Sequence, residues 1–252
     1  MLLLASCTIA LALHLQPGSH VVEHSTYDDR VRWVLPPDKL AGFERAGVVI
    51  TEDTQTSIVA LATAAAPLRD MLTLNGTIST TVTDVPRRRT QHNTSAFSTT
   101  ITPRNDPLPA QALDLEGSAM IELPAQPLCV GQVWKTHVPV KTTLGSGTAT
   151  IEHTVVSIEG SLVEVDVTGV GTITGREYNL PHLLPGSLSI SGKAWFDVGA
   201  GMISQESYLV RNRLIKTVHD STIGFIETET VDVTTHVGKP TAMLPADPRT
   251  KR

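Results

Sequence analysis

The 252-residue sequence has few of the residues that mark specialised classes of protein. Its two cysteines exclude a disulfide-rich scaffold, and aromatic residues make up only 4% of the chain. With 20 Lys and Arg against 25 Asp and Glu, the net charge is -5, so we expect no general basic surface and no nucleic-acid partner. The 40% of hydrophobic residues is typical of a folded chain that buries a full core.

Motifs that carry chemistry are also missing. The sequence contains no Gly-x-Ser-x-Gly, and Gly145-Ser146-Gly147 is typical of a hairpin turn. His219-Asp220-Ser221 has the residue types of a catalytic triad, but neighbours on a strand point to opposite faces. His137 and His153 are predicted to face each other across a hairpin, and two ligands do not complete a zinc site. We therefore expect a non-enzymatic protein with no catalytic residues, no metal and no cofactor.

An uncharged, mostly apolar run, MLLLASCTIALAL, opens the chain. A membrane-spanning helix needs about 20 apolar residues, and this run has instead the length of a signal-peptide hydrophobic region. Ala10-Leu11-Ala12 fits ordinary signal cleavage, Leu4-Ala5-Ser6-Cys7 resembles a lipobox in which Cys7 is acylated, and a buried N-terminal helix is a third interpretation. We expect residues 1–16 to be a signal of one of the first two kinds. The protein would then be exported to the periplasm, the cell envelope or the medium, either free or anchored by lipid.

Export also bears on the cysteines. If Cys7 is removed or acylated, Cys129 has no partner in the chain for a disulfide. Because Cys129 lies between Leu128 and Val130, we expect it to be a small buried hydrophobic residue.

From Gly117 onward the sequence alternates as β-strands do. The clearest case is the alternation of Val163, Val165 and Val167 with acidic residues. Further strands are predicted at Trp134–Val140, Thr148–Ile158, Leu188–Phe196, Met202–Val210 and Ile223–Val237, with turns at Glu159-Gly160 and at Asp197–Gly201. Pro139 places the first of these strands at a sheet edge, because proline cannot donate to a ladder.

In the last predicted strand, Ile223–Val237, the alternation that would point apolar side chains to the buried face is irregular. Glu227 and Glu229 have the same parity as Val231 and Val233, and a β-bulge near Thr230-Val231 would reconcile this by shifting the register.

The first half of the chain is predicted less regularly. Val31–Leu35 is an expected strand, and Asp38 an expected cap for a short helix through Arg45. Threonine-rich strands are expected at Leu74–Thr83 and Ser95–Thr102. Residues 57–66 leave helix and strand open: alanine and the helical spacing of the apolar residues favour a helix, which we prefer, whereas the β-rich surroundings favour a strand.

Proline-rich joints lie between the two halves. They leave open whether one β domain over residues 20–238 is subdivided near 103–127. Residues 239–252 show no alternation, and we expect them to form a flexible tail.

Several motifs in the second half occur together. Leu123–Pro127 leads into Val130-Gly131-Gln132-Val133-Trp134, and Gly192–Asp197 leads through a glycine turn into Met202-Ile203-Ser204. On these motifs residues 123–210 resemble bacterial exported proteins of uncharacterised function, of the DUF6263-like and LolA/LppX-like half-barrel type. The resemblance implies a long antiparallel sheet curled into an open half-barrel, with one or two short helices covering it, and it implies no catalytic residues.

A curled sheet with one apolar face needs a cover or a ligand. We therefore expect a cell-envelope protein that binds an apolar ligand, such as a lipid, in its concave face. The expected lining residues are Trp134, Val163, Val165, Trp195 and Phe196. The alternative is a structural or adaptor module that docks envelope proteins through exposed strand edges.

Overall fold

The computed structural model describes residues 9–67, 71–104, 113–114, 122–176, 183–218 and 221–240. Most of them belong to one sheet of eleven strands, so the expected fold class, a long curled antiparallel meander, is confirmed. The strands are β1 (His20–Val34), β2 (Thr51–Ala64), β3 (Leu72–Asp84), β4 (Arg89–Ile101), β5 (Leu113–Asp114), β6 (Val133–Thr142), β7 (Gly145–Glu159), β8 (Leu162–Arg176), β9 (Leu183–Asp197), β10 (Met202–Val218) and β11 (Ser221–Gly238). The one helix in these ranges is α1 (Pro37–Arg45), and none there has the length and apolarity to span a membrane.

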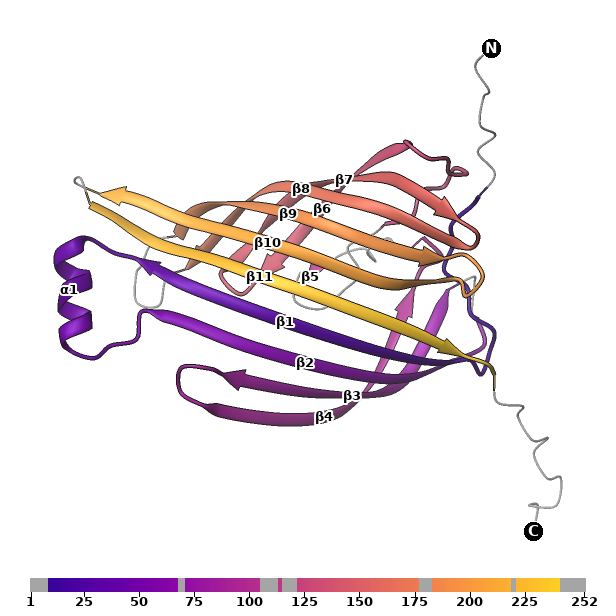
Figure 1. Ribbon diagram of the computed structural model, residues 1–252, viewed down its shortest axis with the longest axis horizontal. Helices are drawn as coiled ribbons and strands as arrows, with labels where there is room; N and C mark the ends of the chain where they lie inside the picture. Colours follow the sequence, from indigo (N-terminus) through magenta and orange to yellow (C-terminus); the bar gives the residue numbers. More distant parts are fainter. Residues whose placement is uncertain are drawn as a thin grey trace, which may run out of the picture.

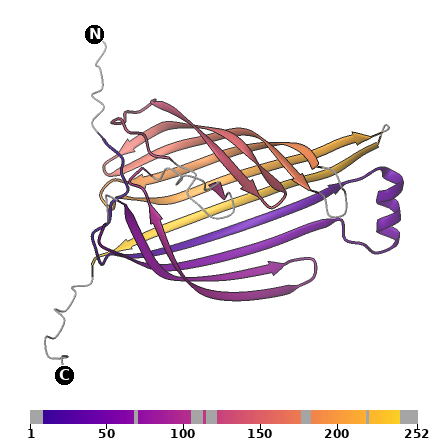
Figure 2. The ribbon, with the colours of Figure 1, turned by 180° about the vertical axis from the view of Figure 1, so that it is seen from behind.

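The strand order is β4-β3-β2-β1-β11-β10-β9-β8-β7-β6-β5. The chain starts in the middle of the sheet, meanders outward to β4, crosses to the opposite edge and meanders back until β11 lies beside β1. All neighbours are antiparallel except β5, which pairs with β6 in parallel. Figure 1 shows the long strands side by side, and Figure 2 shows them from behind. The sheet is open, since its order ends at β4 and at β5.

Alternation along the strands gives the sheet two different faces. On β8, Val163 and Val165 are completely buried, whereas Val170, of opposite parity, is 68% exposed. We call the buried side the concave face. The core that lies against it also includes Leu123 and Leu128, from the connection that joins the two edges of the sheet.

Residues 9–19 run across one end of the sheet, where β11 ends (Figure 1). Leu11 and Leu13 are buried in the core. The backbone N–H of Leu13 donates to the carbonyl of Pro103 at 2.7 Å. This part of the apolar N-terminal run is therefore packed as extended chain rather than as a helix.

The helix α1 lies at the other end of the sheet (Figure 1). It packs Phe43 against Trp33, with ring centroids 6.4 Å apart, and Trp33 packs in turn on Phe225. The predicted cap is wrong, because Pro36 occupies the N-cap position and no side chain caps the helix.

The prediction of a helix over residues 57–66 is wrong. The strand β2 continues to Ala64 and pairs with β1 and with β3. Its inward side chains include Ala60, Ala62 and Ala64, which are small enough to lie on a curled concave face. Pairing on both sides therefore outweighs the helical propensity of alanine.

The predicted bulge in the last strand is also wrong. β11 pairs with both of its neighbours in unbroken register from Gly224 to Thr234. Glu227 and Glu229 therefore point to the concave face, as the valines that follow them do, and both are buried. The register shifts of the sheet lie elsewhere, in β7 and in β10.

The other predicted strands and the turns at Glu159-Gly160 and Asp197–Gly201 are confirmed, although most strands are longer than expected. The hairpin turn predicted at Gly145-Ser146-Gly147 is wrong, because these residues begin β7 and the turn lies at Thr143-Leu144. The turn between β7 and β8 has Gly160 at a φ of 62°, a conformation that glycine adopts without strain. Pro139 lies in β6, next to Val140 and Lys141, which pair with the short strand β5. Among the described residues, no other pairing is found on that side of β6, as the prediction of an edge strand requires.

Candidate ligand site on the concave face

The residues predicted to line a ligand site do not all come together. Val163, Val165 and Phe196 lie on the concave face and are at most 1% exposed. Trp195 is the neighbour of Phe196 and lies on the opposite, outer face, where its register partner is Glu164.

Trp134 is held in place by two contacts. Its ring stacks on the imidazole of His153, with centroids 4.8 Å apart and planes 6° apart. Its indole N–H donates to the carbonyl of Glu122 at 2.8 Å. Because His153 is fully buried, the stacked pair closes the core beside β6.

A polar strip, missed by the sequence prediction, runs along the middle of the concave face. It lies where β1, β11 and β10 are neighbours, and its side chains share inward parity with buried valines of the same strands. We call it the inner polar seam and define it as Glu23, Ser25, Tyr27 and Asp29 of β1, Glu227 and Glu229 of β11, and Glu206, Tyr208 and Asn212 of β10.

The pairing register sets these residues in rows across the three strands. Read toward α1, the rows are Ser25–Val233–Glu206, Tyr27–Val231–Tyr208, Asp29–Glu229–Val210 and Val31–Glu227–Asn212. Carboxylates therefore occur on both sides of the tyrosine row. Glu206, Glu227 and Glu229 are at most 5% exposed.

Hydroxyl groups of the seam donate to its carboxylates. The hydroxyl of Tyr208 donates to Glu206 Oε1 at 2.6 Å, and that of Ser25 donates to Glu23 Oε1 at 3.2 Å. These bonds fix two of the carboxylates and use donors from the same strand.

Asn212 contributes both a donor and an acceptor. Its Nδ2 donates to Glu227 Oε2. Its Oδ1 is buried and, among the described residues, has no hydrogen-bond partner. Leaving a buried acceptor without a donor costs about 1–3 kcal/mol, so a hydrogen-bond donor that reached this oxygen would stabilise the seam.

The pKa values of Glu23 and Tyr27 show that the seam is poorly solvated and that negative charges lie near Tyr27. Burial raises the pKa of the Glu23 carboxyl, and the hydrogen bond from Ser25 opposes part of the rise. Burial also raises the pKa of Tyr27 to about 12. The nearby charges that raise it further are those of Glu23, Glu229 and Glu206. The phenol is therefore neutral at physiological pH.

Carboxylates on the outer face behave in the opposite way. Glu164 Oε1 lies 2.5 Å from the ammonium of Lys193. The hydrogen bond from Lys193 lowers the pKa of Glu164. The two faces of the sheet thus give carboxyl groups contrasting environments.

Beside the seam, the concave face of β2 and β3 is less completely covered. The inward side chains Thr56, Ile58 and Ala60 of β2 and Ile78 of β3 are all half-buried. Small and apolar groups thus line this wing, which adjoins β1.

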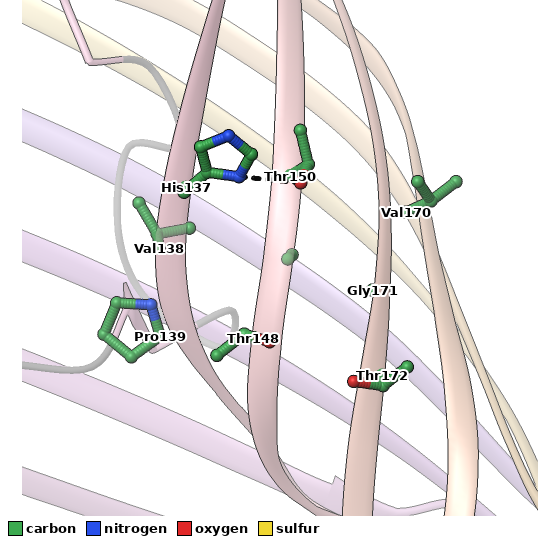
Figure 3. A pocket seen from close by; sticks show the side chains of 9 residues that line it. His137, Val138, Pro139, Thr148, Thr150, Val170, Gly171 and Thr172 are labelled. Carbon is green, nitrogen blue, oxygen red and sulfur yellow. Dashed lines mark hydrogen bonds between the residues drawn. The ribbon is translucent and has the colours of Figure 1, made fainter.

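A shallow groove of about 570 Å³ lies on the outer face of β6, β7 and β8. Figure 3 shows His137 there, hydrogen-bonded to Thr150 at 2.8 Å, with Val170 on the far side. His153 points to the concave face, so the prediction that His137 and His153 face each other is wrong. Strand alternation separates them, because the register partner of His153 is Trp134.

Cys129 is disulfide-bonded, so the expectation of a lone hydrophobic cysteine is wrong. The chain contains one other cysteine, Cys7, which lies outside the described residues. Acylation of Cys7 and a disulfide at Cys7 exclude each other, since both consume its thiol. His219 and Asp220 of the triad-like segment also lie outside the described residues.

Within the described ranges, no group of three or more His, Cys, Asp or Glu side chains is arranged to hold a metal ion. The fold and the seam define a class, an open curled β-meander whose concave face is part apolar and part acidic. No protein-family model matches the chain, and a search of curated proteins found no match.

Proposed function

We propose that this chain is a non-enzymatic, exported protein of the cell envelope that binds an apolar or amphiphilic ligand, such as a lipid, against its concave face. The observation that carries the proposal is the half-buried wing of β2 and β3, whose inward side chains are less covered than those of β7 to β9. There Ile58, Ala60 and Ile78 leave apolar surface beside the seam. Concave apolar surfaces with a few polar groups are typical of small-molecule sites.

Export is supported by the disulfide at Cys129, because such bonds persist in oxidising compartments outside the cytosol. The chain's one other cysteine is Cys7, so export with this bond intact leaves Cys7 in place and unacylated. Cleavage of residues 1–16 and acylation of Cys7, the two forms of the expected signal, would each remove the bond.

Lipid extraction of the purified chain, followed by mass spectrometry, tests ligand binding. We expect a copurifying amphiphile, and we expect Ile58→Trp to reduce its amount because the indole fills the wing. Leu61→Trp is the matched control, since Leu61 is 51% exposed on the outer face of the same strand. Absence of any bound amphiphile, or equal loss in both variants, would contradict the proposal.

A second function, docking of an envelope protein, is favoured by the exposed edge of the sheet. β4 ends the strand order, and its residues from Arg89 to Ala96 are exposed. Such an edge can pair with a strand of a partner. A photo-cross-linker at Thr94 that captures one defined partner, in a chain that binds no amphiphile, would favour this function over the first.

A further inference from the structure

We propose that four arginines on the outer, convex face of the sheet form a docking site for the surface of an anionic phospholipid bilayer. The site lies on the face opposite to the proposed ligand site, so this inference goes beyond the proposed function.

The pairing register sets the four arginines in two neighbouring rows. Read from β1 across β11 to β10, the rows are Arg30–Thr228–Arg211 and Arg32–Ile226–Arg213. All four arginines are exposed, and the residues between them, Val31 on β1 and Asn212 on β10, are buried on the other face. We call these six residues of the two rows the outer arginine patch.

Most of the positive charge of the patch is unpaired. Arg30 lies 3.2 Å from the carboxylate of Asp53 on β2. Arg32, Arg211 and Arg213 form no ion pair with a described residue. Three guanidinium groups are therefore available to an anion.

The outer face is divided by charge. On β1, β11 and β10 its described carboxylates are those of Asp28 and Asp232, and both lie on the side of the patch away from α1. The half of this face near α1 is therefore positive, although the whole chain has a net charge of -5. A local patch of this kind turns one face of a negatively charged protein toward an anionic surface.

The polar groups of the patch match the chemistry of phosphate. A guanidinium group donates in pairs to phosphate oxygens. Thr228 lies inside the patch, and Ser189 and Ser187 of β9 are the register partners of Arg211 and Arg213. These hydroxyl groups add further donors without adding negative charge.

Apolar side chains among the arginines favour a lipid surface over a soluble polyanion. Ile226 lies between Arg32 and Arg213. Leu209 and Ile215 flank the two arginines of β10 on the same face, and all three apolar side chains are only half-buried. Surfaces that lie in the headgroup layer of a membrane combine apolar and basic side chains in this way.

The place of the patch in the sheet fits a flat partner. A flat bilayer meets a convex face at its crest, which is formed by the middle strands. β10 has five strands on each side of it in the strand order, and β11 and β1 are the next two strands on one side. The arginines therefore lie where a bilayer would touch the curled sheet first.

Vesicle flotation with the full chain tests this inference. The vesicles contain either phosphatidylcholine alone or an equimolar mixture of phosphatidylcholine and phosphatidylglycerol. We expect binding to the mixed vesicles only, and we expect added salt to weaken it because exposed charges are screened.

Variants locate the effect. The double variant Arg211→Gln, Arg213→Gln should bind the mixed vesicles about 25-fold more weakly, since each arginine near an anionic lipid surface contributes a factor of about five. The double variant Lys135→Gln, Lys193→Gln is the matched control. It removes the same charge from the outer face, at lysines that are paired with Glu152 at 2.8 Å and with Glu164 at 2.5 Å. If the arginine double variant folds poorly, Arg32→Gln repeats the comparison from β1.

Each outcome decides for or against the docking site. Binding to the mixed vesicles that salt and the arginine variants weaken, and that the lysine variant retains, supports it. Equal binding to both kinds of vesicle, or equal loss in the two double variants, overturns it. Binding of dextran sulfate without binding of either vesicle overturns it in favour of an anionic glycan.

Discussion

The individual residues that set this protein apart are carboxylates on the buried side of a β-sheet. An apolar side chain of similar volume at Glu227 or Glu229 would avoid the cost of taking a charge out of water, which is several kcal/mol. Glu227 offsets part of this cost by accepting a hydrogen bond from Asn212 Nδ2.

The first prediction concerns Glu23, whose folded-state pKa is raised by burial above its ordinary value of 4.5. Between that value and the raised pKa the folded state binds the extra proton, so the free energy of unfolding falls as the pH rises through this window. We expect Glu23→Gln to stabilise the fold at neutral pH and to have little effect well below pH 4.5. Urea denaturation over a pH series measures this, and a gain of equal size at every pH would contradict it.

The second prediction concerns Cys129 and separates a disulfide from acylation of Cys7. We expect Cys129→Ser, or reduction of the native chain, to lower the free energy of unfolding by about 2–4 kcal/mol, because the cross-link restricts the unfolded chain. Thiol titration in denaturant should find no free thiol before reduction. A free thiol at Cys129 together with an acylated Cys7 would show that the lipobox interpretation is the right one.

At the scale of strands and turns, period-two alternation predicted most of the sheet. It predicted the strands over Val163–Val167 and Leu188–Phe196 because packing and alternation agree there. It was wrong at residues 57–66, where alanine favours a helix locally and only the pairing with β1 and β3 favours a strand. In β11 the parity of Glu227 was read correctly, but the cost of burying it suggested a bulge that the structure lacks.

The third prediction concerns the tight curl of the sheet between β9 and β10. A Cβ added at Gly192 would lie 2.6 Å from Cδ1 of Tyr208 and would also meet the carbonyl oxygen of Ser207. We expect Gly192→Ala to cost about 1–3 kcal/mol of stability through overpacking, and to move the Tyr208 ring within the seam. Thermal or urea denaturation measures the cost.

Gly42→Ala is its control. Gly42 lies in the exposed helix α1 with open space around its Cα, so alanine there should stabilise by about 0.5–1 kcal/mol. Equal effects of the two substitutions would show that the close approach at Gly192 does not matter.

At the scale of the whole molecule, the seam depends on contacts between distant parts of the chain. β1 pairs with β11, so Tyr27 lies opposite Val231. The residues of either strand alone do not indicate which residues of the other strand they pair with, because the two strands lie at opposite ends of the sequence. The sequence therefore predicted an apolar concave face from β7 to β9, where neighbouring strands are consecutive, and missed the acidic strip where the two ends of the meander meet.

The last prediction asks whether the N-terminal segment belongs to the folded molecule. Leu13 is 6% exposed in the core, so Leu13→Ala should cost about 2–5 kcal/mol in a chain that retains this segment. Leu61→Ala, at a side chain 51% exposed on the outer face, should cost far less. A chain beginning at Pro17 lacks Leu11 and Leu13 and also Cys7, so both chains are compared in reducing buffer, where neither has the disulfide at Cys129. There the shorter chain should still be less stable than the full chain in a urea titration. Equal stability of the two chains would mean that the core closes without the segment, as a cleaved signal requires, whereas a large loss would mean that the segment is part of the folded protein.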